Sequence, residues 1–314
     1  MMARAVRFDR YGDREVLYVA DVQVPSPSID EVVVEVKAAA INPGEAAIRS
    51  GALDSRFPAT FPSGEGSDLA GVVSAVGDVA TEFAVGDEVL GWSWRRSSHA
   101  EYVAVPVDQL IPKPRQLSWE VAGSLYVVGC TAYAAVRAVR PEPGETVVVS
   151  AAAGGVGTVV VQLLKTKNVT VLGIASEQNH DWLRSHGVIP IAYGDGLIQR
   201  LSAAAPNGID AFIDLFGPEY LQLAVDLGVE PTRIETIISR DEAQQLGAKT
   251  EGSVDASTTE VLAEIAELVA SGRVELPIAA TYPLEQVRDA FAELEERHTH
   301  GKIVLIPRVR VSVP

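Results

Sequence analysis

Five short apolar segments alternate with helix-compatible segments between residues 145 and 246, and this alternation limits the possible folds more than any other feature of the chain. The apolar segments are ETVVVSA (145–151), VTVLGIAS (169–176), VIPIAYG (188–194), IDAFIDLFG (209–217) and RIETIIS (233–239). Apolar strands that alternate with helices indicate right-handed crossovers and a parallel sheet with helices on both faces. The sequence therefore predicts a doubly wound α/β domain.

The first of these strands leads into a glycine-rich turn, from which a helix is expected to start. In the dinucleotide-binding pattern Gly-x-Gly-x-x-Gly, the second glycine lets phosphates approach the backbone and the third lets the helix pack closely on the strand. Gly154 and Gly157 occupy these two places, whereas Ala152 stands at the first. A helix N-terminus offers bare N–H groups and a partial positive charge to a pyrophosphate. We therefore predict a dinucleotide site here, with a tight turn that binds no ligand as the alternative.

The end of the next strand bears on which dinucleotide binds. An acidic side chain at this place would hold the ribose 2′-hydroxyl of NAD. The strand instead ends in small neutral residues up to Ser176, which leaves room for a 2′-phosphate. Glu177 follows one residue later and would serve NAD if the strand end were displaced. The residues favour NADPH over NADH.

The flanking segments differ in character from this central part. Valine-rich runs in residues 31–42 and 71–92 are broken by Gly-Asp pairs, which indicates strands joined by tight turns. Residues 257–272 predict a helix, because Ser257 and Glu260 form a capping box and Gly272 closes the segment. The tail predicts one more helix, with an apolar face of Leu284, Val287, Phe291 and Leu294, followed by the strand KIVLIP.

Composition and charge exclude several classes of partner. The net charge of -16 repels phosphate backbones and anionic membrane surfaces, so we expect neither nucleic acid nor a membrane as a partner. No apolar run reaches the ~18–20 residues of a membrane span, and the first residues are charged where a secretory leader would be apolar. We expect a cytoplasmic protein. The single cysteine, Cys130, excludes a cysteine-based zinc cluster, and His298 and His300 fit a solvated loop better than a metal site.

Motifs along nearly the whole chain carry a family resemblance. In order they are AVRFDRYGDREVL, AAAINPGEAAIRSG (38–51), EGSDLAGVVSAVGD (65–78), VGDEVLG (85–91), HAEYVAVP (99–106), GCTAY (129–133), AAAGGVG (151–157) and HGKIVLIP (300–307). With these motifs the chain resembles the zinc-independent quinone oxidoreductases of the medium-chain dehydrogenase/reductase superfamily.

The resemblance implies a domain organisation and a reaction. A GroES-like β-rich catalytic domain would consist of residues 1–117 and 274–314, and an NADP(H)-binding Rossmann domain of residues 118–273 would be inserted between them. The resemblance implies NADPH as the hydride source, a quinone or an α,β-unsaturated carbonyl compound as the acceptor, and a homodimer. It implies no metal in the site.

The resemblance also assigns roles to individual residues. The nicotinamide would lie near Asn42, Thr131, Phe216 and Gly217, the pyrophosphate on Gly154, Gly155, Val156 and Gly157, the adenosine 2′-phosphate near Ser176 and Tyr193, and Lys302 would approach the cofactor. Simpler roles remain open for two of these residues: Asn42 as a cap of the turn at Pro43, and Tyr193 as a packing residue at a strand end.

Two positions depart from the family pattern. Relatives often carry a lysine or arginine where this chain has Gln178, which donates hydrogen bonds to a 2′-phosphate but adds no charge, so the preference for NADPH is weakened. Relatives also often carry a tyrosine where this chain has Ala47, which offers no proton. The negative charge that develops on the acceptor oxygen would then need Asn42, a backbone N–H group or water as its hydrogen-bond donor.

Trp92 and Trp94 are candidates for an aromatic wall against a flat acceptor, with ordinary packing as the alternative. Arg95 and Arg96 fit a solvated charged loop. Two other functions remain open: a non-catalytic or regulatory NADPH-binding protein of the same fold, and an enoyl-thioester reductase. The latter would need a long basic groove, which the acidic composition disfavours.

Overall fold

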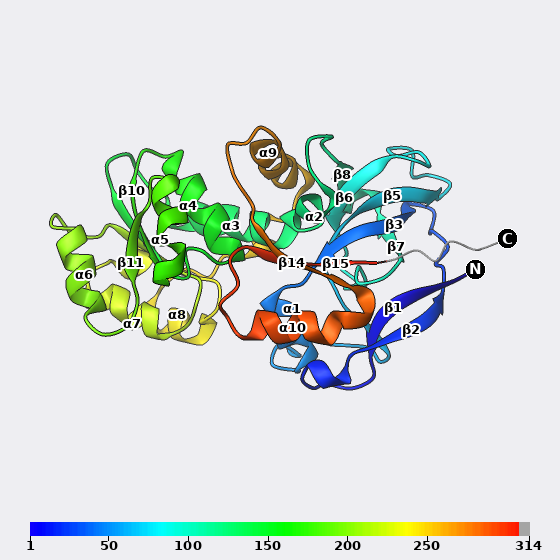
Figure 1. The fold of residues 1–314 in the computed structure, drawn as a ribbon, viewed down its shortest axis with the longest axis horizontal. Helices are drawn as coiled ribbons and strands as arrows, with labels where there is room; N and C mark the ends of the chain where they lie inside the picture. The colour runs from blue at the N-terminus through cyan, green and yellow to red at the C-terminus, as the bar shows by residue number, and fades with distance from the viewer. Residues whose placement is uncertain (308–314) are drawn as a thin grey trace. The chain divides into compact units, whose positions relative to one another are not determined.

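The structure is a computed structural model that describes residues 1–307 and divides into two compact units (Figure 1). The second unit consists of Val128–Ser257 and Val274–Pro277. The first unit consists of Met1–Val127, Thr258–Arg273 and the described residues from Ile278 onward. These boundaries differ from the expected ones at both ends of the inserted part.

The second unit contains a five-stranded, wholly parallel sheet in the order β11-β10-β9-β12-β13. Its strands are β9 (Thr146–Val149), β10 (Thr170–Ala175), β11 (Ile189–Ala192), β12 (Ala211–Asp214) and β13 (Ile234–Thr236). Val148, Leu172 and Phe212 from the three central strands are fully buried in one core. Because both faces of such a sheet are covered, its strands are nearly continuous apolar runs. The predicted doubly wound sheet is confirmed.

Helices connect these strands in the predicted alternation. They are α3 (Leu125–Val139), α4 (Gly155–Lys165), η3 (Glu177–Asn179), α5 (His180–Ser185), α6 (Leu197–Ala204), α7 (Glu219–Asp226), η4 (Pro231–Arg233), α8 (Arg240–Leu246) and η5 (Ser253–Ala256).

The first unit is built on a seven-stranded sheet in the order β14-β15-β3-β5-β6-β8, with β7 also paired to β3. A smaller sheet has the order β2-β1-β4. The strands are β1 (Met2–Phe8), β2 (Tyr18–Gln23), β3 (Glu31–Ala40), β4 (Ser63–Gly64), β5 (Asp68–Val76), β6 (Glu88–Trp92), β7 (Tyr102–Pro106), β8 (Leu110–Pro112), β14 (Ile278–Pro283) and β15 (Lys302–Ile306).

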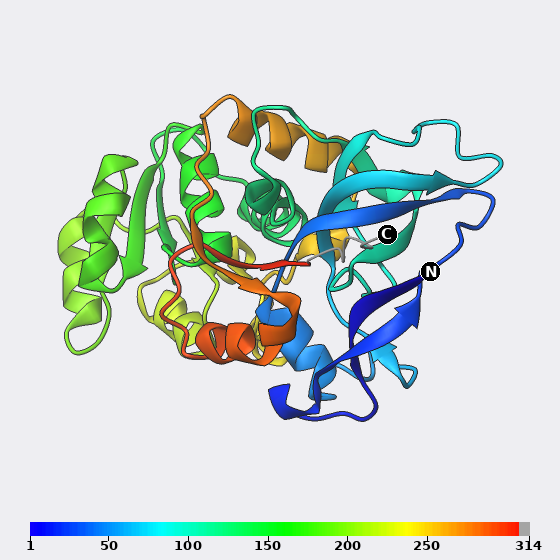
Figure 2. The ribbon, with the colours of Figure 1, turned by 45° about the vertical axis from the view of Figure 1, so that its right-hand side comes forward.

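Strand β15 comes from the far end of the described chain and pairs with β3, with Val304 opposite Ala40 (Figure 2). The helices of this unit are η1 (Arg14–Val16), α1 (Pro43–Arg49), η2 (Val107–Gln109), α2 (Trp119–Ala122), α9 (Thr259–Ala270), η6 (Leu284–Gln286) and α10 (Val287–Glu295). The predicted apolar face of the tail helix is buried in a core with Val6 and Phe8.

Helix α9 differs from the expectation in two ways. Its N-cap is Thr258, whose hydroxyl accepts a hydrogen bond from the Val261 amide over 3.2 Å. The predicted cap, Ser257, instead donates to the carbonyl oxygen of Ser253 over 2.6 Å. The helix also belongs to the first unit, where it contacts β8, and not to the nucleotide-binding part in which it was expected. Within residues 1–307 no helix combines the length and the apolar character that a bilayer crossing needs.

Candidate functional site

The turn between β9 and α4 has the backbone that the sequence predicts for an anion site. Ala151 adopts the left-handed conformation with a φ of 45°, and the Gly154 amide donates to its carbonyl oxygen over 3.0 Å. Gly154 is the N-cap of α4, and Thr158 donates the bond that returns to the Gly154 carbonyl oxygen over 2.9 Å. The amides of Gly155, Val156 and Gly157 precede that bond, so they belong to the orphan donors of a helix N-terminus.

The two glycines of the fingerprint have different surroundings. A Cβ atom on Gly157 would lie 2.2 Å from the Ala151 carbonyl oxygen, so only glycine lets α4 approach the turn this closely. A Cβ atom on Gly154 would meet only this same oxygen, at 3.3 Å. Gly157 therefore serves the packing of helix against turn, whereas the outer side of Gly154 stays open for the close approach of a ligand. This turn fits the pyrophosphate of a dinucleotide.

Ser176 and Tyr193 lie next to each other in the fold, although the sequence separates them. Strands β10 and β11 are in register with Ala175 opposite Ala192, so the two residues follow directly at the carboxyl ends of neighbouring strands. The Ser176 hydroxyl accepts from the Asn179 side chain over 3.0 Å, and Tyr193 is 51% exposed. Glu177 and Gln178 are exposed in η3.

Arg200 supports the loop that carries Tyr193. Its guanidinium donates to the carbonyl oxygens of Ala192 over 2.8 Å, Tyr193 over 3.2 Å and Asp195 over 2.7 Å. Arg200 could not be predicted from the sequence, because an arginine within a helical segment carries no signal of such a contact. The Arg200 bonds fix the backbone after β11.

The other predicted residues of the second unit lie on β12 and α3. Phe216 and Gly217 follow the carboxyl end of β12, and both amides donate to the carboxylate of Asp214 over 3.0 and 3.2 Å. Thr131 is buried on α3. The structure thus brings the glycine turn, Ser176, Tyr193 and the Phe216 loop to the carboxyl edge of one parallel sheet, which is where doubly wound sheets bind ligands.

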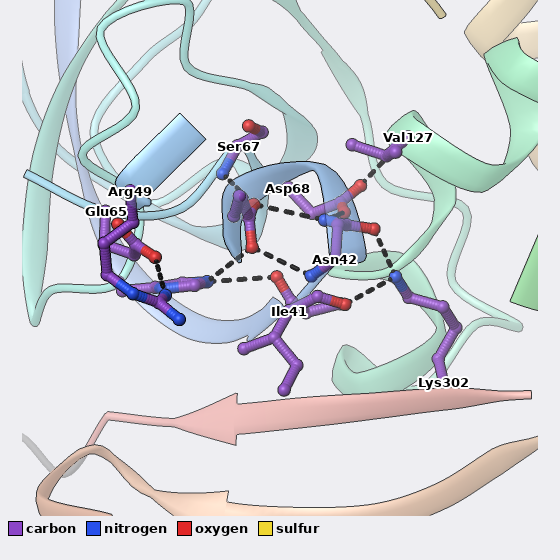
Figure 3. Close-up of polar contacts among 11 residues, drawn as sticks. Ile41, Asn42, Arg49, Glu65, Ser67, Asp68, Val127 and Lys302 are labelled. Carbon is purple, nitrogen blue, oxygen red and sulfur yellow. Dashed lines mark hydrogen bonds and ion pairs between the residues drawn. The ribbon is translucent and has the colours of Figure 1, made fainter. Parts of the chain in front are cut away.

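In the first unit, Asn42 and Lys302 are in direct contact inside a buried polar network (Figure 3). The Lys302 ammonium donates to the Asn42 side-chain oxygen over 2.5 Å and to the Ile41 carbonyl oxygen over 2.9 Å. The Asn42 side-chain nitrogen donates to Asp68 over 2.8 Å and to Glu45 over 3.1 Å. Every polar atom of the Asn42 side chain is therefore engaged, and its orientation is fixed.

Local structure explains how Asn42 reaches this place. It is the N-cap of α1, with Pro43 as the first helical residue, and its own amide donates to the Glu45 carboxylate over 2.8 Å. Asn42 thus has the capping role that the sequence left open, in addition to its contact with Lys302. Hydrogen bonds from the amides of Ser67 to Glu45 and Val127 to Asp68 hold the two carboxylates.

Burial governs the charges in this network. It raises the pKa of Asp68 to about 6, against the opposing effect of the Lys302 charge. Burial lowers the pKa of Lys302, and the carboxylates of Asp68 and Glu45 oppose that shift. Neither carboxylate was predicted from the sequence, although a charged residue at the start of the apolar strand DLAGVV was a signal for Asp68.

Trp92 and Trp94 occupy different environments beside this network. Trp92 is opposite Asp68 in the register of β5 and β6, and its ring stacks on that of Tyr126 at 4.7 Å and 11°. Trp94 meets both rings edge-on at 6.3 and 6.1 Å. Trp92 is 2% exposed and packs in the core, whereas Trp94 is 45% exposed. Of the two, Trp94 is the one that offers aromatic surface.

The arginines after Trp94 are engaged within the first unit. Arg95 forms an ion pair with the buried Glu31 at 2.7 Å, and Arg96 donates to the Pro58 carbonyl oxygen over 2.9 Å. Among the residues that the structure describes, no three His, Cys, Asp or Glu side chains gather in a way that could hold a metal ion.

Two family models match the chain. One is described as "Alcohol dehydrogenase GroES-like domain" and matches residues 28–115, and the other is described as "Zinc-binding dehydrogenase" and matches residues 188–305. Together with the sheets described above, they confirm the predicted fold class, a GroES-like domain and a Rossmann-like parallel sheet.

Relatives and solved structures cover nearly the whole chain. The quinone oxidoreductase of Mus musculus is 30% identical over 326 residues, which cover 97% of this chain and 98% of the relative. The solved quinone oxidoreductase from Coxiella burnetii has a TM-score of 0.86 and 28% identity, and covers 98% of this chain and 100% of its own. The solved Escherichia coli quinone oxidoreductase complexed with NADPH has a TM-score of 0.85 and 25% identity, with 97% and 100% covered.

The parallel sheet with its glycine turn, the matched families and the extent of these similarities agree with one another. The chain belongs to the quinone oxidoreductase-like members of the medium-chain dehydrogenase/reductase superfamily and is an oxidoreductase.

Proposed function

We propose that the chain is an NADPH-dependent reductase that transfers a hydride to a quinone or an α,β-unsaturated carbonyl acceptor without a metal ion. The observation that carries the proposal is the β9–α4 turn, in which Gly157 lets the helix pack on Ala151 and the first amides of α4 precede its first returning hydrogen bond. When bound, NADPH supplies the hydride. The task of the chain is to bind and orient the two reactants.

The proposed nucleotide contacts lie along the carboxyl edge of the second unit. Gly154, Gly155, Val156 and Gly157 bind the pyrophosphate through backbone amides. Ser176, Gln178 and Tyr193 bind the adenosine 2′-phosphate end. Thr131, Phe216 and Gly217 contact the nicotinamide, and Lys302 is a further proposed cofactor contact.

On the acceptor side, the proposed catalytic residue is Asn42. The Lys302 ammonium donates a hydrogen bond to the Asn42 side-chain oxygen and polarises the amide group. This polarisation strengthens the Asn42 N–H groups as donors. Both of its N–H groups are held by carboxylates, and we propose that an acceptor oxygen takes the place of Glu45, whose 3.1 Å bond is longer than the 2.8 Å bond to Asp68. Quinones and enones tolerate a weak donor, because the negative charge that forms on them is delocalised. The exposed ring of Trp94 offers a stacking surface to such flat acceptors.

The same hydrogen bonds favour a second candidate function. If Asn42 keeps both N–H groups on Glu45 and Asp68, it does not replace the tyrosine that relatives carry at the position of Ala47. Without a backbone N–H group or water as the donor instead, the protein binds NADPH and reduces no acceptor. This second candidate is a non-catalytic or regulatory NADPH-binding protein of the same fold.

Two measurements distinguish these functions. Calorimetric titration with NADPH and NADH tests binding. NADPH oxidation is then followed with a panel of quinones and enones, and NADP⁺ reduction with a panel of alcohols, each with and without a chelator. The proposal expects tighter binding of NADPH and chelator-insensitive turnover of quinones or enones. Binding without turnover supports the second function, and chelator-sensitive alcohol oxidation with silence toward quinones and enones overturns both. The proposal also includes a cytoplasmic location and a homodimer, and sedimentation of the purified protein tests the latter.

A further inference from the structure

Asp214 is a fully buried carboxylate at the end of β12 that accepts hydrogen bonds from Thr236 on β13 and from residues that follow β9 and β12. One oxygen accepts from the Ser150 hydroxyl over 2.8 Å, and from the amides of Phe216 and Gly217. The other oxygen accepts from the Thr236 hydroxyl over 2.8 Å. Ser150 follows β9 and Thr236 ends β13, the two neighbours of β12 in the sheet.

The hydroxyl groups of Ser150 and Thr236, which donate to Asp214, also accept hydrogen bonds from backbone amides of the loops. The Ser150 hydroxyl accepts from the Leu215 amide over 2.8 Å. The Thr236 hydroxyl accepts from the amides of Ile238 and Ser239, each over 3.2 Å. One carboxylate thus organises the three loops that follow β9, β12 and β13, all at the carboxyl edge of the sheet.

The burial of the Asp214 carboxylate is energetically unfavourable by itself. Burial raises the pKa of Asp214, and the hydrogen bonds it accepts oppose that shift. Removal of a carboxylate from water is unfavourable unless strong hydrogen bonds compensate it. The loops that it holds include Ser150, which is followed by the left-handed Ala151 and the glycine turn, and Phe216 with Gly217.

We infer that Asp214 is a positioning residue for the dinucleotide: it does not touch the ligand, and it fixes the spacing between the turn that binds the pyrophosphate and the Phe216–Gly217 loop that contacts the nicotinamide. The inference rests on the proposed function, since it requires a dinucleotide on this edge. A rigid ligand that bridges two loops binds tightly only when the loops are held at the matching distance, so displacement of either loop weakens binding.

Three substitutions break the connection in graded ways. Asp214→Asn keeps an oxygen for the Phe216 and Gly217 amides but turns an N–H group toward the Thr236 hydroxyl, whose oxygen already accepts two amides. Thr236→Val removes that hydroxyl alone. Ser150→Ala removes the link between the β9 loop and the Leu215 amide.

The chain offers two matched controls. Asp210 lies at the opposite end of β12 and accepts a hydrogen bond from the Thr146 amide at the start of β9 over 2.8 Å, so Asp210→Ala loosens the same two strands at the amino edge. Val148→Ala removes buried methyl groups from the centre of β9, which lowers stability without a change at the loops.

The test is the dissociation constant for NADPH by calorimetry, together with the melting temperature of each unliganded variant. We expect Asp214→Asn to raise the Kd about tenfold or more, and Thr236→Val and Ser150→Ala to raise it several-fold. Both controls should stay within about twofold of the wild type, even where Val148→Ala melts at a lower temperature.

The outcomes separate the two proposals. If the wild type binds NADPH and Asp214→Asn binds it equally well, the positioning role is wrong and the proposed function stands. If the wild type binds no nicotinamide nucleotide, the proposed function fails and the positioning role fails with it. Should Asp214→Asn not fold, unchanged Kd values in both Thr236→Val and Ser150→Ala overturn the inference. A Kd that rises as much in Val148→Ala as in these variants overturns it as well, because the effect is then one of stability.

Discussion

Lys302 donates a 2.5 Å hydrogen bond to the side chain of Asn42, although 260 residues separate the two in the sequence. The bond joins β15 to the N-cap of α1, and Asp68 and Glu45 complete the network on the other side of the Asn42 amide. Within the part of the chain that the structure describes, Lys302 is the only cation in contact with Asn42. Its charge therefore balances the two buried carboxylates of Asp68 and Glu45.

Removal of this cation should destabilise the protein strongly. In Lys302→Met, the charges of Asp68 and Glu45 would remain buried without their partner, and we expect the free energy of unfolding to fall by about 3–5 kcal/mol. Urea denaturation measures the loss. Lys167→Met removes an exposed lysine and serves as the control. An equal, small change in both variants would contradict the role assigned to Lys302.

The two glycines of the turn should respond differently to alanine. In Gly157→Ala the new Cβ atom would lie 2.2 Å from the Ala151 carbonyl oxygen, so α4 must shift, and we expect a loss of about 1–3 kcal/mol of stability. In Gly154→Ala the same oxygen is 3.3 Å away, so the fold should persist while the added methyl group blocks the nucleotide phosphates. Thermal melting and calorimetry with NADPH measure the two effects. Gly154→Ala with wild-type affinity for NADPH would argue against a pyrophosphate on this turn.

A positive charge at position 178 should increase the preference for NADPH over NADH. Gln178 is exposed in η3, directly after the segment that contains Ser176. Gln178→Lys adds an ammonium that can pair with a 2′-phosphate, and an exposed pair of this kind contributes up to about 1 kcal/mol, or roughly fivefold in affinity. The ratio of Kd values for NADH and NADPH should rise by this factor at low salt and less at high salt. Gln245→Lys, on exposed α8, should leave the ratio unchanged; an equal rise there would mean that net charge alone is responsible.

Glu235 should make stability depend on pH. It is fully buried on β13, and burial raises its pKa to about 8, with the charge of Glu251 acting in the same direction. Because the folded-state pKa lies above the ordinary value of 4.5, the folded state binds a proton that the unfolded state releases. Stability from this group is therefore complete below pH 4.5 and is lost as the pH rises toward 8.

Glu235→Gln should remove that dependence. Relative to the variant, the wild type should lose on the order of 2–4 kcal/mol of unfolding free energy between pH 5 and pH 8. Denaturation at a series of pH values measures the difference, with Glu242→Gln on exposed α8 as the control. Parallel curves for the wild type and Glu235→Gln would show that Glu235 does not titrate differently in the two states.

The sequence predicted the second unit well, because its determinants are local. A strand buried on both faces must be a continuous apolar run such as that of β9, and Gly157 is required by the packing of one turn. The parallel sheet with its crossover helices is predicted by the alternation of apolar and helix-compatible segments. The cap of α9 could not be decided in this way, since Ser257 and Thr258 are both suitable residues and only the path of the chain from η5 selects Thr258.

The polar networks could not be predicted from the sequence. Asp214, Ser150 and Thr236 meet because β12 lies between β9 and β13, and Asn42 meets Lys302 because β15 pairs with β3. Strand order is set by the packing of the complete chain, and no local pattern encodes it. The resemblance placed Asn42 and Lys302 near a common ligand. The carboxylates of Glu45 and Asp68, which hold the Asn42 side chain, could be identified only from the fold.

The pairing of β15 with β3 has a consequence for synthesis on the ribosome. Residues 128–257 are continuous and leave the exit tunnel before β15 of the first unit, so most of the second unit can form while translation proceeds. Ala39 and Ala40 find their partners, Leu305 and Val304, only after the whole second unit has been synthesised. Until then the stretch of β3 at Ala39 and Ala40 lacks its β15 partner, and an unpaired strand edge of this kind can pair with another chain.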